Sequence, residues 1–446
     1  MKHSARSRSS DLVSRRAFLG SAGLTGAALA TPLAGQNITE APLRLARPDG
    51  LPKVVARDEA YWKRVAARYR VSDRVTNLEA GYWGMMAVPV LAEYVRQVER
   101  VNVENSFYAR GAYTADLLAV RKRVAAALGA DVTEIALTRG ATEALQCLIG
   151  GYNRLKPGDA VMYADLDFPS MQYAMNWLTE RRGARVARFA IPEPATRENV
   201  LDAYTAALDA NPNVRLLLLT HVNNKTGLMI PVAAITALAR QRGVDVIVDA
   251  AHSWGQVDVT VGDIGADFIG FNLHKWIGAP LGVGVMFVRK GRLGDIDAMM
   301  GNEEQSNDSI LSRVHSGTIN FAAVLTVPAA LDFHAAVGPV YKAARLRYLR
   351  DRWVGPARNL PGLDILTPDD QEMVAAITSF RLQGRTSRED NQRIVDDLRT
   401  RYGVFTVRRN GLERGDCVRV TPGLYNRPAD VDRLVAALKQ LSLERR

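Results

Sequence analysis

The sequence predicts an α/β protein with a mainly parallel sheet in a large domain and a small C-terminal α/β domain. From about residue 77 to residue 333, short apolar stretches alternate with longer helical stretches, which is the pattern of strand–helix–strand units. Polar residues follow several of the apolar stretches, as is typical where ligands bind at the carboxyl ends of parallel strands. A helical stretch that opens with a proline, residues 339–359, links this region to the small domain.

Four segments are expected along the 446 residues, a length that is sufficient for two domains in one packed unit. They are a leader over residues 1–34, an arm with a helix over residues 35–76, the large domain over residues 77–335, and the small domain over residues 336–446. Within the small domain we expect strands at residues 373–382, 404–409 and 417–421, and helices at residues 388–401 and 428–441.

The amino terminus carries a twin-arginine export pattern, Ser14-Arg15-Arg16-Ala17-Phe18-Leu19. The apolar run behind it, residues 17–30, is shorter than the roughly 20 residues that a membrane span requires. We therefore expect a removable signal rather than an anchor, and no stable membrane association. The twin-arginine translocation machinery is the expected partner, and the periplasm or another exported location is the expected destination.

The first polar turn of the large domain is suited to an anion. Thr138-Arg139-Gly140-Ala141-Thr142 follows a short apolar strand and opens an apolar helix. Backbone N–H groups at a helix N-terminus bind phosphate, Gly140 lets the backbone approach it, and Thr142 adds a hydroxyl donor. By itself the turn is equally explained as a helix cap.

Three further strand ends carry polar side chains. Asn224 follows the strand at residues 214–219, Asp249 ends the strand at residues 246–248, and Lys275 ends the stretch at residues 267–275. Lys275 is followed by the apolar Gly/Pro run at residues 276–282, so we expect it to be enclosed, which lowers the pKa of an amine. The alternatives are a turn former for Asn224, a helix cap for Asp249 and a solvated loop lysine for Lys275.

Asp249 and Lys275 can hold a flat cofactor between them. Strand ends at these positions can place a carboxylate and an amine on opposite sides of one ring. Pyridoxal 5′-phosphate (PLP) requires this arrangement, because the amine bonds to its aldehyde and the carboxylate holds the proton on its ring nitrogen. With the predicted phosphate turn and Asn224, the order of polar groups predicts PLP as the cofactor and Lys275 and Asp249 as catalytic residues.

At this point the chain resembles the class V aminotransferase family of fold-type I PLP enzymes, and within it the isopenicillin N epimerase-like branch. Exported members of pyoverdine maturation are similar to it as well. The resemblance is carried by residues 138–144, 221–227, 248–252, 272–282, 317–320 and 418–421, with Tyr425 and Asn426. It implies the fold-type I architecture, with a seven-stranded sheet in the large domain, and a homodimer.

The resemblance also implies roles for individual residues. Lys275 would carry the cofactor, Asp249 would pair with its ring nitrogen, and Arg419 would bind the substrate α-carboxylate. The residues implied near the phenolate oxygen are His252 and Asn224. The residues implied at the phosphate are Ala141, Thr142, Asn272 and His274, with Gly317 and Thr318 reaching the phosphate of the neighbouring subunit.

The local sequence pattern also predicts roles for Phe168 and Arg419. Phe168 follows an acidic strand end and is the candidate for stacking on the ring, with a core aromatic as the alternative. Arg419 alternates with Val418 and Val420, so it faces the opposite side of its strand, where its planar fork matches a carboxylate. An exposed strand arginine is the alternative for Arg419.

Composition limits the classes of partner. The formal charge is +11, and about +7 remains without the leader, spread along the chain rather than clustered with aromatic residues. This argues against nucleic-acid binding and favours attraction of acidic small molecules. The two cysteines, Cys147 and Cys417, give neither a disulfide framework nor a metal site, and we expect neither to be catalytic, although Cys417 shares a strand face with Arg419.

The expected function is aminotransferase-type chemistry on an amino acid or an amino-acid-containing metabolite in the periplasm, with siderophore tailoring as the expected role by analogy. One alternative is a C–S lyase or cysteine desulfurase, and another is an amino-acid epimerase like isopenicillin N epimerase. The third alternative is a non-catalytic PLP-fold binding protein. The presence of Lys275 argues against it, because a protein that only binds does not need a lysine that bonds to the cofactor.

Overall fold

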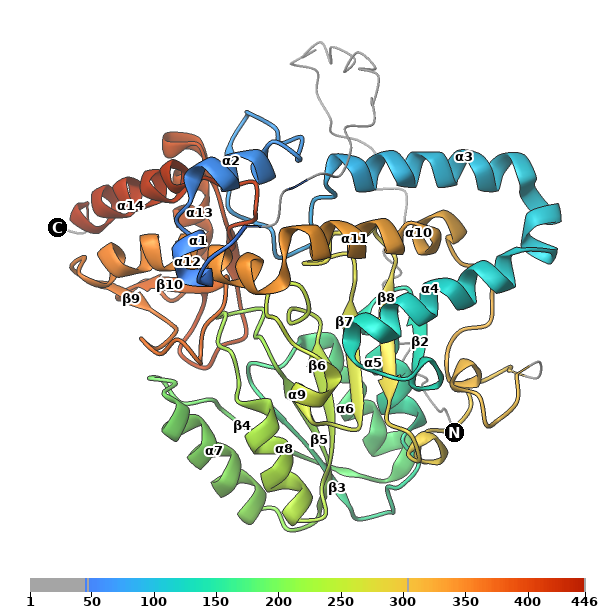
Figure 1. Ribbon diagram of the computed structural model, residues 1–446. Coiled ribbons are helices and arrows are strands. Elements are labelled where there is room, and N and C mark those ends of the chain that lie inside the picture. The colour runs from blue at the N-terminus through green and yellow to red at the C-terminus, as the bar shows by residue number, and fades with distance from the viewer. Residues whose placement is uncertain (1–44, 46–47, 303–304, 445–446) are drawn as a thin grey trace, which may run out of the picture. The chain divides into compact units, whose positions relative to one another are not determined.

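The computed structural model describes residue 45 and residues 48–302 and 305–444 (Figure 1). The predicted leader, with Arg15 and Arg16, lies outside the described residues. Within the described part, no single helix is long and apolar enough to cross a membrane. One bent pair, Phe321–Val337 with Pro339–Arg358, meets the length and composition criterion.

A seven-stranded sheet forms the centre of the large domain, with the strand order β2-β8-β7-β6-β5-β3-β4. Only β8 runs antiparallel to its neighbours, so the predicted mainly parallel sheet is confirmed. The strands are β2 (Ile135–Thr138), β3 (Ala160–Ala164), β4 (Arg185–Phe189), β5 (Val214–Thr220), β6 (Asp245–Ala250), β7 (Phe268–Asn272) and β8 (Gly284–Val288).

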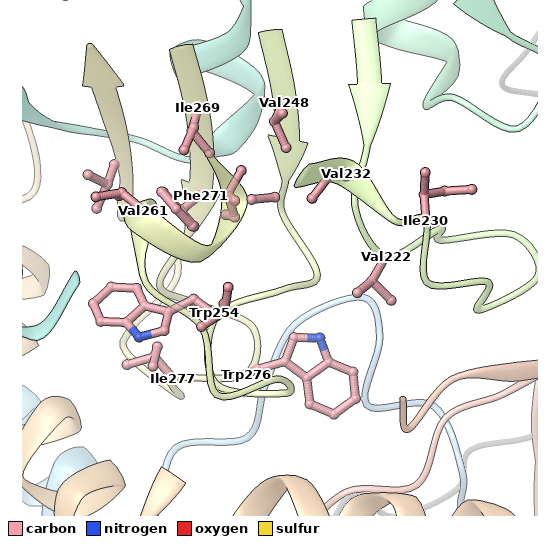
Figure 2. Close-up of a cluster of buried hydrophobic side chains, with 14 of the residues drawn as sticks. Val222, Ile230, Val232, Val248, Trp254, Val261, Ile269, Phe271, Trp276 and Ile277 are labelled. Carbon is pink, nitrogen blue, oxygen red and sulfur yellow. The ribbon is translucent and has the colours of Figure 1, made fainter. Parts of the chain in front are cut away.

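The sheet is buried on both faces, which explains why its central strands read as continuous apolar runs. In β5, Leu216 and Leu218 pack into one core cluster, whereas Leu217 and Leu219 pack into the other. Figure 2 shows part of the second cluster, including Val248 of β6 and Phe271 of β7. Two layers of helices therefore enclose the sheet.

The helices of one layer are α5 (Ala141–Gly151) and α6 (Pro169–Arg182), whose buried side chains pack with Leu216 and Leu218. The helices that contribute to the other cluster are α2 (Glu59–Ala66), α4 (Tyr113–Leu128), α7 (Arg197–Asp209), α8 (Val232–Gln241), α9 (Val261–Ile264), α10 (Phe321–Leu325) and α11 (Val327–Val337). The long helix α3 (Val88–Arg110) packs on α10, α11 and α4 (Figure 1).

The C-terminal part is a separate small α/β layer with its own core cluster. The linking helix α12 (Pro339–Arg358) precedes a four-stranded antiparallel sheet of order β12-β13-β10-β9. Its strands are β9 (Leu363–Ile365), β10 (Thr378–Leu382), β12 (Val407–Arg409) and β13 (Cys417–Val420), and its helices are α13 (Arg388–Tyr402) and α14 (Pro428–Leu443).

The single strand predicted at residues 404–409 is wrong, because the chain changes sheets within it. Residues Val404–Phe405 form β11, which pairs in parallel with β1 (Thr76–Asn77), whereas β12 pairs with β13. Thr406 lies between the two strands and is fully buried. The strand at residues 373–382 is also shorter than predicted, since β10 begins only at Thr378.

The N-terminal arm continues into the small domain. After α1 (Pro52–Val55) and α2, the backbone N–H of Thr421 donates to Leu78 O at 2.8 Å, and that of Ala80 donates to Thr421 O at 3.0 Å. The predicted domain limit at residue 77 therefore falls inside a segment that is hydrogen-bonded to the C-terminal strands.

Candidate active site

A cavity of about 460 Å³ lies where the sheet meets the small domain. Ten of the twelve predicted site residues line it: Ala141, Thr142, Phe168, Asn224, Asp249, His252, Asn272, His274, Lys275 and Arg419. The other two, Gly317 and Thr318, are exposed and do not line this cavity. Their predicted contact with a neighbouring subunit stays a prediction.

The strand order explains why these residues meet. Strands β5, β6 and β7 are parallel neighbours, and Thr220 at the end of β5 lies opposite Asp249 in β6. Strand β7 ends at Asn272, so the prediction of a strand that continues to Lys275 is wrong. Lys275 lies instead in the following loop, which turns it back over the end of the sheet.

The anion turn at the start of α5 is preorganised by β7. Asn272 Oδ1 accepts a hydrogen bond of 2.7 Å from the backbone N–H of Ala141. A side chain at Gly140 would place its Cβ only 3.1 Å from Asn272 Oδ1, so glycine permits this close approach. The N–H of Thr142 lies in the first turn of the helix, where no helix carbonyl is available to it, and it remains suited to a phosphate.

The Lys275 amine lies beside His252 and has a lowered pKa. Its Nζ lies 3.0 Å from His252 Nε2, and burial lowers the pKa of its amine to about 8. The indole N–H of Trp276 lies 3.3 Å from His252 Nδ1, and an indole can only donate. The proton of a neutral His252 is therefore on Nε2, the nitrogen that faces the Lys275 amine.

Neutral His252 agrees with its surroundings, because burial holds its pKa well below the usual range. The Trp276 loop is itself anchored, since Lys342 of α12 donates to Trp276 O from a buried position. Figure 2 shows Trp276 and Trp254 beyond the ends of the strands. The sequence does not single out Trp276, because it reads as part of the apolar run at residues 276–282.

The loop of Lys275 also needs a glycine that the sequence did not single out. The N–H of Gly84 donates to His274 O at 2.8 Å. A Cβ at Gly84 would lie 1.7 Å from Lys275 O, so any side chain here would displace the lysine backbone. The segment after the N-terminal arm therefore helps to fix the catalytic lysine.

Asp249 is a buried carboxylate opposite the lysine. Its Oδ1 accepts from the N–H of Ala251 at 2.9 Å, and burial raises the pKa of the acid. A cation beside Asp249 would favour its charged carboxylate form. A protonated ring nitrogen of the cofactor would be such a cation. Behind it, Asp167 accepts from the N–H and the hydroxyl of Thr220 at 3.1 and 2.5 Å, and burial raises its pKa to about 7.

Arg419 is not the exposed strand arginine of the alternative prediction, because it is 1% exposed. Its Nη1 donates to Asn224 O at 2.8 Å, and its Nη2 donates to Glu79 Oε1. Glu79 and a second cavity arginine, Arg409, were both missed. The sequence gives little indication of a role for Arg409. Residues 404–409 were predicted as one strand but form two strands in different sheets, so the side to which Arg409 faces could not be predicted.

The remaining candidates are placed as follows. Phe168 is half-buried at the N-cap of α6 and lines the cavity, which is compatible with stacking on a ring. Asn224 Oδ1 is buried without a hydrogen-bond partner among the described residues, so an amide that faces the cavity is available to a ligand. No described group of three or more His, Cys, Asp or Glu residues is arranged to hold a metal ion.

The two cysteines lie away from the catalytic cavity. Cys417 is fully buried with its Sγ 3.7 Å from Lys225 O, and burial raises the pKa of its thiol to about 11. Cys147 is also buried, which raises its pKa to about 12. Neither thiol lines the cavity that holds Lys275.

Both the sequence and the fold are similar to those of known proteins. The sequence model of the family described as aminotransferase class-V matches residues 86–434. The chain belongs to the aminotransferase class-V family. Membership of this family, together with Lys275 and the buried Asp249 in one cavity, confirms PLP as the cofactor.

Curated relatives carry several activities in their names. The chain is 26% identical to isopenicillin N epimerase of Streptomyces clavuligerus over 86% of this chain and 99% of that protein. It is 26% identical to a probable cysteine desulfurase of Vibrio cholerae over 73% and 82% of the two chains. None of these relatives is described as a siderophore-tailoring enzyme, so that link stays a prediction.

Solved structures confirm the fold-type I architecture. The cysteine desulfurase CsdA of Escherichia coli superposes with a TM-score of 0.72 at 23% identity, covering 86% of this chain and 98% of that chain. The cystine C-S lyase C-DES, solved with its product cysteine persulfide, gives 0.70 at 20% identity and covers 82% and 97%. These likenesses establish the fold and not the reaction.

The cavity residues fit the cofactor. Lys275 would bond to the aldehyde, Asp249 would hold the proton on the ring nitrogen, and Phe168 would cover the ring. The N-terminus of α5 with Thr142 would hold the phosphate. When bound, the cofactor supplies an electron sink that stabilises negative charge at the substrate Cα.

Proposed function

We propose that this protein is a PLP-dependent enzyme that removes the α-proton of an amino acid or an amino-acid-containing metabolite. The observation that carries the proposal is the place of the Lys275 amine, which lies 3.0 Å from His252 Nε2 in one cavity with the buried Asp249 and has a pKa lowered to about 8. An uncharged amine can accept a proton, and the lowered pKa makes this form far more populated near neutral pH than in an ordinary lysine. A protein that only bound PLP would not need this arrangement.

Each residue of the site has its own role in this proposal. Lys275 would accept the α-proton at its Nζ, and His252, held by Trp276, orients this amine. Asp249 keeps negative charge next to the ring nitrogen. The arginine-lined wall of the cavity attracts the substrate carboxylate and orients the Cα–H bond.

Transamination is the first candidate, as expected from the sequence, and would require Lys275 to deliver the proton elsewhere than to Cα. Epimerisation is the second candidate, favoured by the two isopenicillin N epimerases that match along 99% and 98% of their lengths. Elimination at a C–S bond is the third, favoured by desulfhydrases such as the putative rice enzyme, 33% identical over 46% of this chain.

One experiment separates these outcomes. The purified holoprotein is incubated with single amino acids in D₂O, with and without a 2-oxo acid. Deuterium at Cα of any substrate supports the proposal, and its absence with all amino acids and short peptides contradicts it. Amino transfer to the oxo acid indicates transamination, deuterium with inversion indicates epimerisation, and release of pyruvate with sulfide indicates elimination.

Neither cysteine should be required. A protein persulfide needs an exposed and mobile thiol, whereas both thiols are buried with raised pKa values. The double variant Cys147→Ala with Cys417→Ala should keep bound PLP and at least about half of the wild-type rate, since a volume change of this kind affects packing rather than chemistry. Loss of sulfur release from cysteine in Cys417→Ala alone would make the desulfurase alternative the leading one.

We further propose export through the twin-arginine route. Replacing Arg15 and Arg16 by lysine keeps the charge but removes the guanidinium groups. We expect a folded, PLP-bound protein that stays in the cytoplasm, measured by fractionation and by the absorbance of the bound cofactor. A variant with Arg6 and Arg8 replaced by lysine is the matched control. Normal periplasmic accumulation of the first variant would refute the route.

A further inference from the structure

His252 lies in the turn that follows β6, and one buried side chain holds that turn from behind. The amide Nε2 of Gln256 donates to His252 O at 2.6 Å. Among the described residues no backbone N–H bonds to this carbonyl, so the Gln256 amide is its hydrogen-bond partner. Both residues are buried, and the loss of this bond would leave a carbonyl unsatisfied inside the protein.

The other end of the Gln256 amide reaches the small domain. Its Oε1 accepts from the backbone N–H groups of Ala376 and Ile377 at 2.8 and 3.2 Å. These two residues directly precede β10, a central strand of the small-domain sheet. The amide is therefore used at both ends, and Gln256 is a bridge between the His252 turn and the start of β10.

The ring of His252 has a second anchor, which also ends in the C-terminal part. Trp276 donates to His252 Nδ1 at 3.3 Å, and Trp276 O accepts from Lys342 of the linking helix α12. The backbone of His252 is thus tied to β10 and its ring is tied to α12. A displacement of His252 breaks at least one of these buried hydrogen bonds.

The two anchors together fix the direction of one proton. Because Nδ1 accepts from the indole, a neutral His252 carries its proton on Nε2, which lies 3.0 Å from Lys275 Nζ. An N–H group can donate to an uncharged amine but cannot accept from a charged one. The place of His252 therefore favours the uncharged form of Lys275, in addition to the effect of burial.

We propose that Gln256 is a positioning residue for the proton transfer at Lys275. It bridges the start of the small-domain sheet to His252, and so keeps the Nε2 proton of His252 directed at the amine. The bridge makes the form of the base depend on how β10 is seated against the His252 turn. This inference rests on the proposed role of Lys275 as the base, and it holds for any amino-acid substrate.

The charged groups around Lys275 act independently of this bridge. Burial has the largest effect on the pKa of the amine and lowers it. The charged side chains that act on it are Asp249 and Glu79, which raise the pKa, and Arg419 and Arg409, which lower it. In the described part of the chain Gln256 bonds to none of these four, so a neutral substitution of Gln256 leaves their charges in place.

The test measures the pKa of the Lys275 amine in the full-length protein after PLP has been removed with hydroxylamine. Only an uncharged amine reacts with acetic anhydride, so acylation of the Lys275 peptide as a function of pH gives this pKa, with the exposed Lys290 as internal reference. Gln256→Met keeps the length of the side chain and loses its hydrogen bonds. We expect the pKa of Lys275 to rise by about 0.5 to 1, which corresponds to one hydrogen bond.

Trp276→Phe tests the other anchor. Phenylalanine cannot donate to Nδ1, so His252 can then carry its proton on that nitrogen and accept from a charged amine at Nε2. We expect the pKa of Lys275 to rise in this variant as well.

Hydrogen exchange of the holoprotein shows whether the bridge is broken, because residues 250–257 and 374–380 should both exchange faster in Gln256→Met. The matched control is Asn391→Leu. Asn391 is also a buried amide, and it donates to Arg385 O and Ser387 O at 3.0 and 2.9 Å, so its bonds stay within the small domain. This control should speed exchange near residues 385–391 and leave the pKa of Lys275 as in the wild type.

Three results would overturn the proposal. One is a wild-type pKa of Lys275 in a Gln256→Met protein whose residues 250–257 exchange faster. Another is unchanged exchange in both segments, and the third is an equal pKa shift in Asn391→Leu. If Gln256→Met gives no soluble protein, Gln256→Asn decides in its place, because its amide is one methylene too short to reach both ends of the bridge. None of these measurements needs a substrate, so a failed search for one would contradict the proposed function alone.

Discussion

Replacing Lys275 by alanine should abolish turnover. The residue combines an amine of lowered pKa, 3.0 Å from His252 Nε2, with a place in the lining of the cofactor cavity. We expect kcat to fall by roughly a thousandfold or more, since both the covalent link and the base are lost. The visible absorbance of lysine-bound PLP should disappear as well, while PLP still binds through its phosphate.

The control for this variant is Lys290→Ala, which removes an exposed lysine that follows β8. It should keep the full rate and the full spectrum. A Lys275→Ala protein with wild-type activity would show that the reaction does not pass through this lysine.

Replacing Asp249 should give the second largest effect. In Asp249→Ala the ring nitrogen loses its charged partner, and kcat should fall by roughly a hundredfold to a thousandfold, as when a preorganised electrostatic group is removed. Asp249→Asn should fall by a similar factor with less structural change, because its amide oxygen can still accept from the N–H of Ala251. Steady-state kinetics and the PLP content of each variant check both expectations.

The matched control is Asp245→Asn, at the opposite end of the same strand. Asp245 accepts from Tyr152 and pairs with Arg292, away from the cavity. If Asp249→Asn retained the wild-type rate while Asp245→Asn lost it, the cofactor would have to lie elsewhere.

Much of the site could be predicted because its chemistry is carried by residues next to readable strands. Asp249 and Asn272 end strands whose apolar runs are unambiguous, and the turn before Ala141 has the residues that an anion site needs. The parallel order of these strands then brings their polar ends to one edge of the sheet.

The residues that were missed act across long sequence separations. Glu79 reaches Arg419 through a bridge to Thr421, and Gly84 fits against the backbone of Lys275. No local pattern reports such contacts. The direction of Arg409 depends on the change of sheet at Thr406, and no Gly, Pro, Asn or Asp in residues 404–409 marks that change in the sequence.

The central claim is that this chain binds PLP covalently through Lys275. It is tested most directly by reducing the purified holoprotein with borohydride, which fixes the cofactor to its lysine, and locating the label by peptide mass spectrometry. We expect one phosphopyridoxyl group per chain, on the peptide that contains Lys275. A label on one of the two buried lysines, Lys225 or Lys342, or no label on a protein that is saturated with PLP, would contradict the claim.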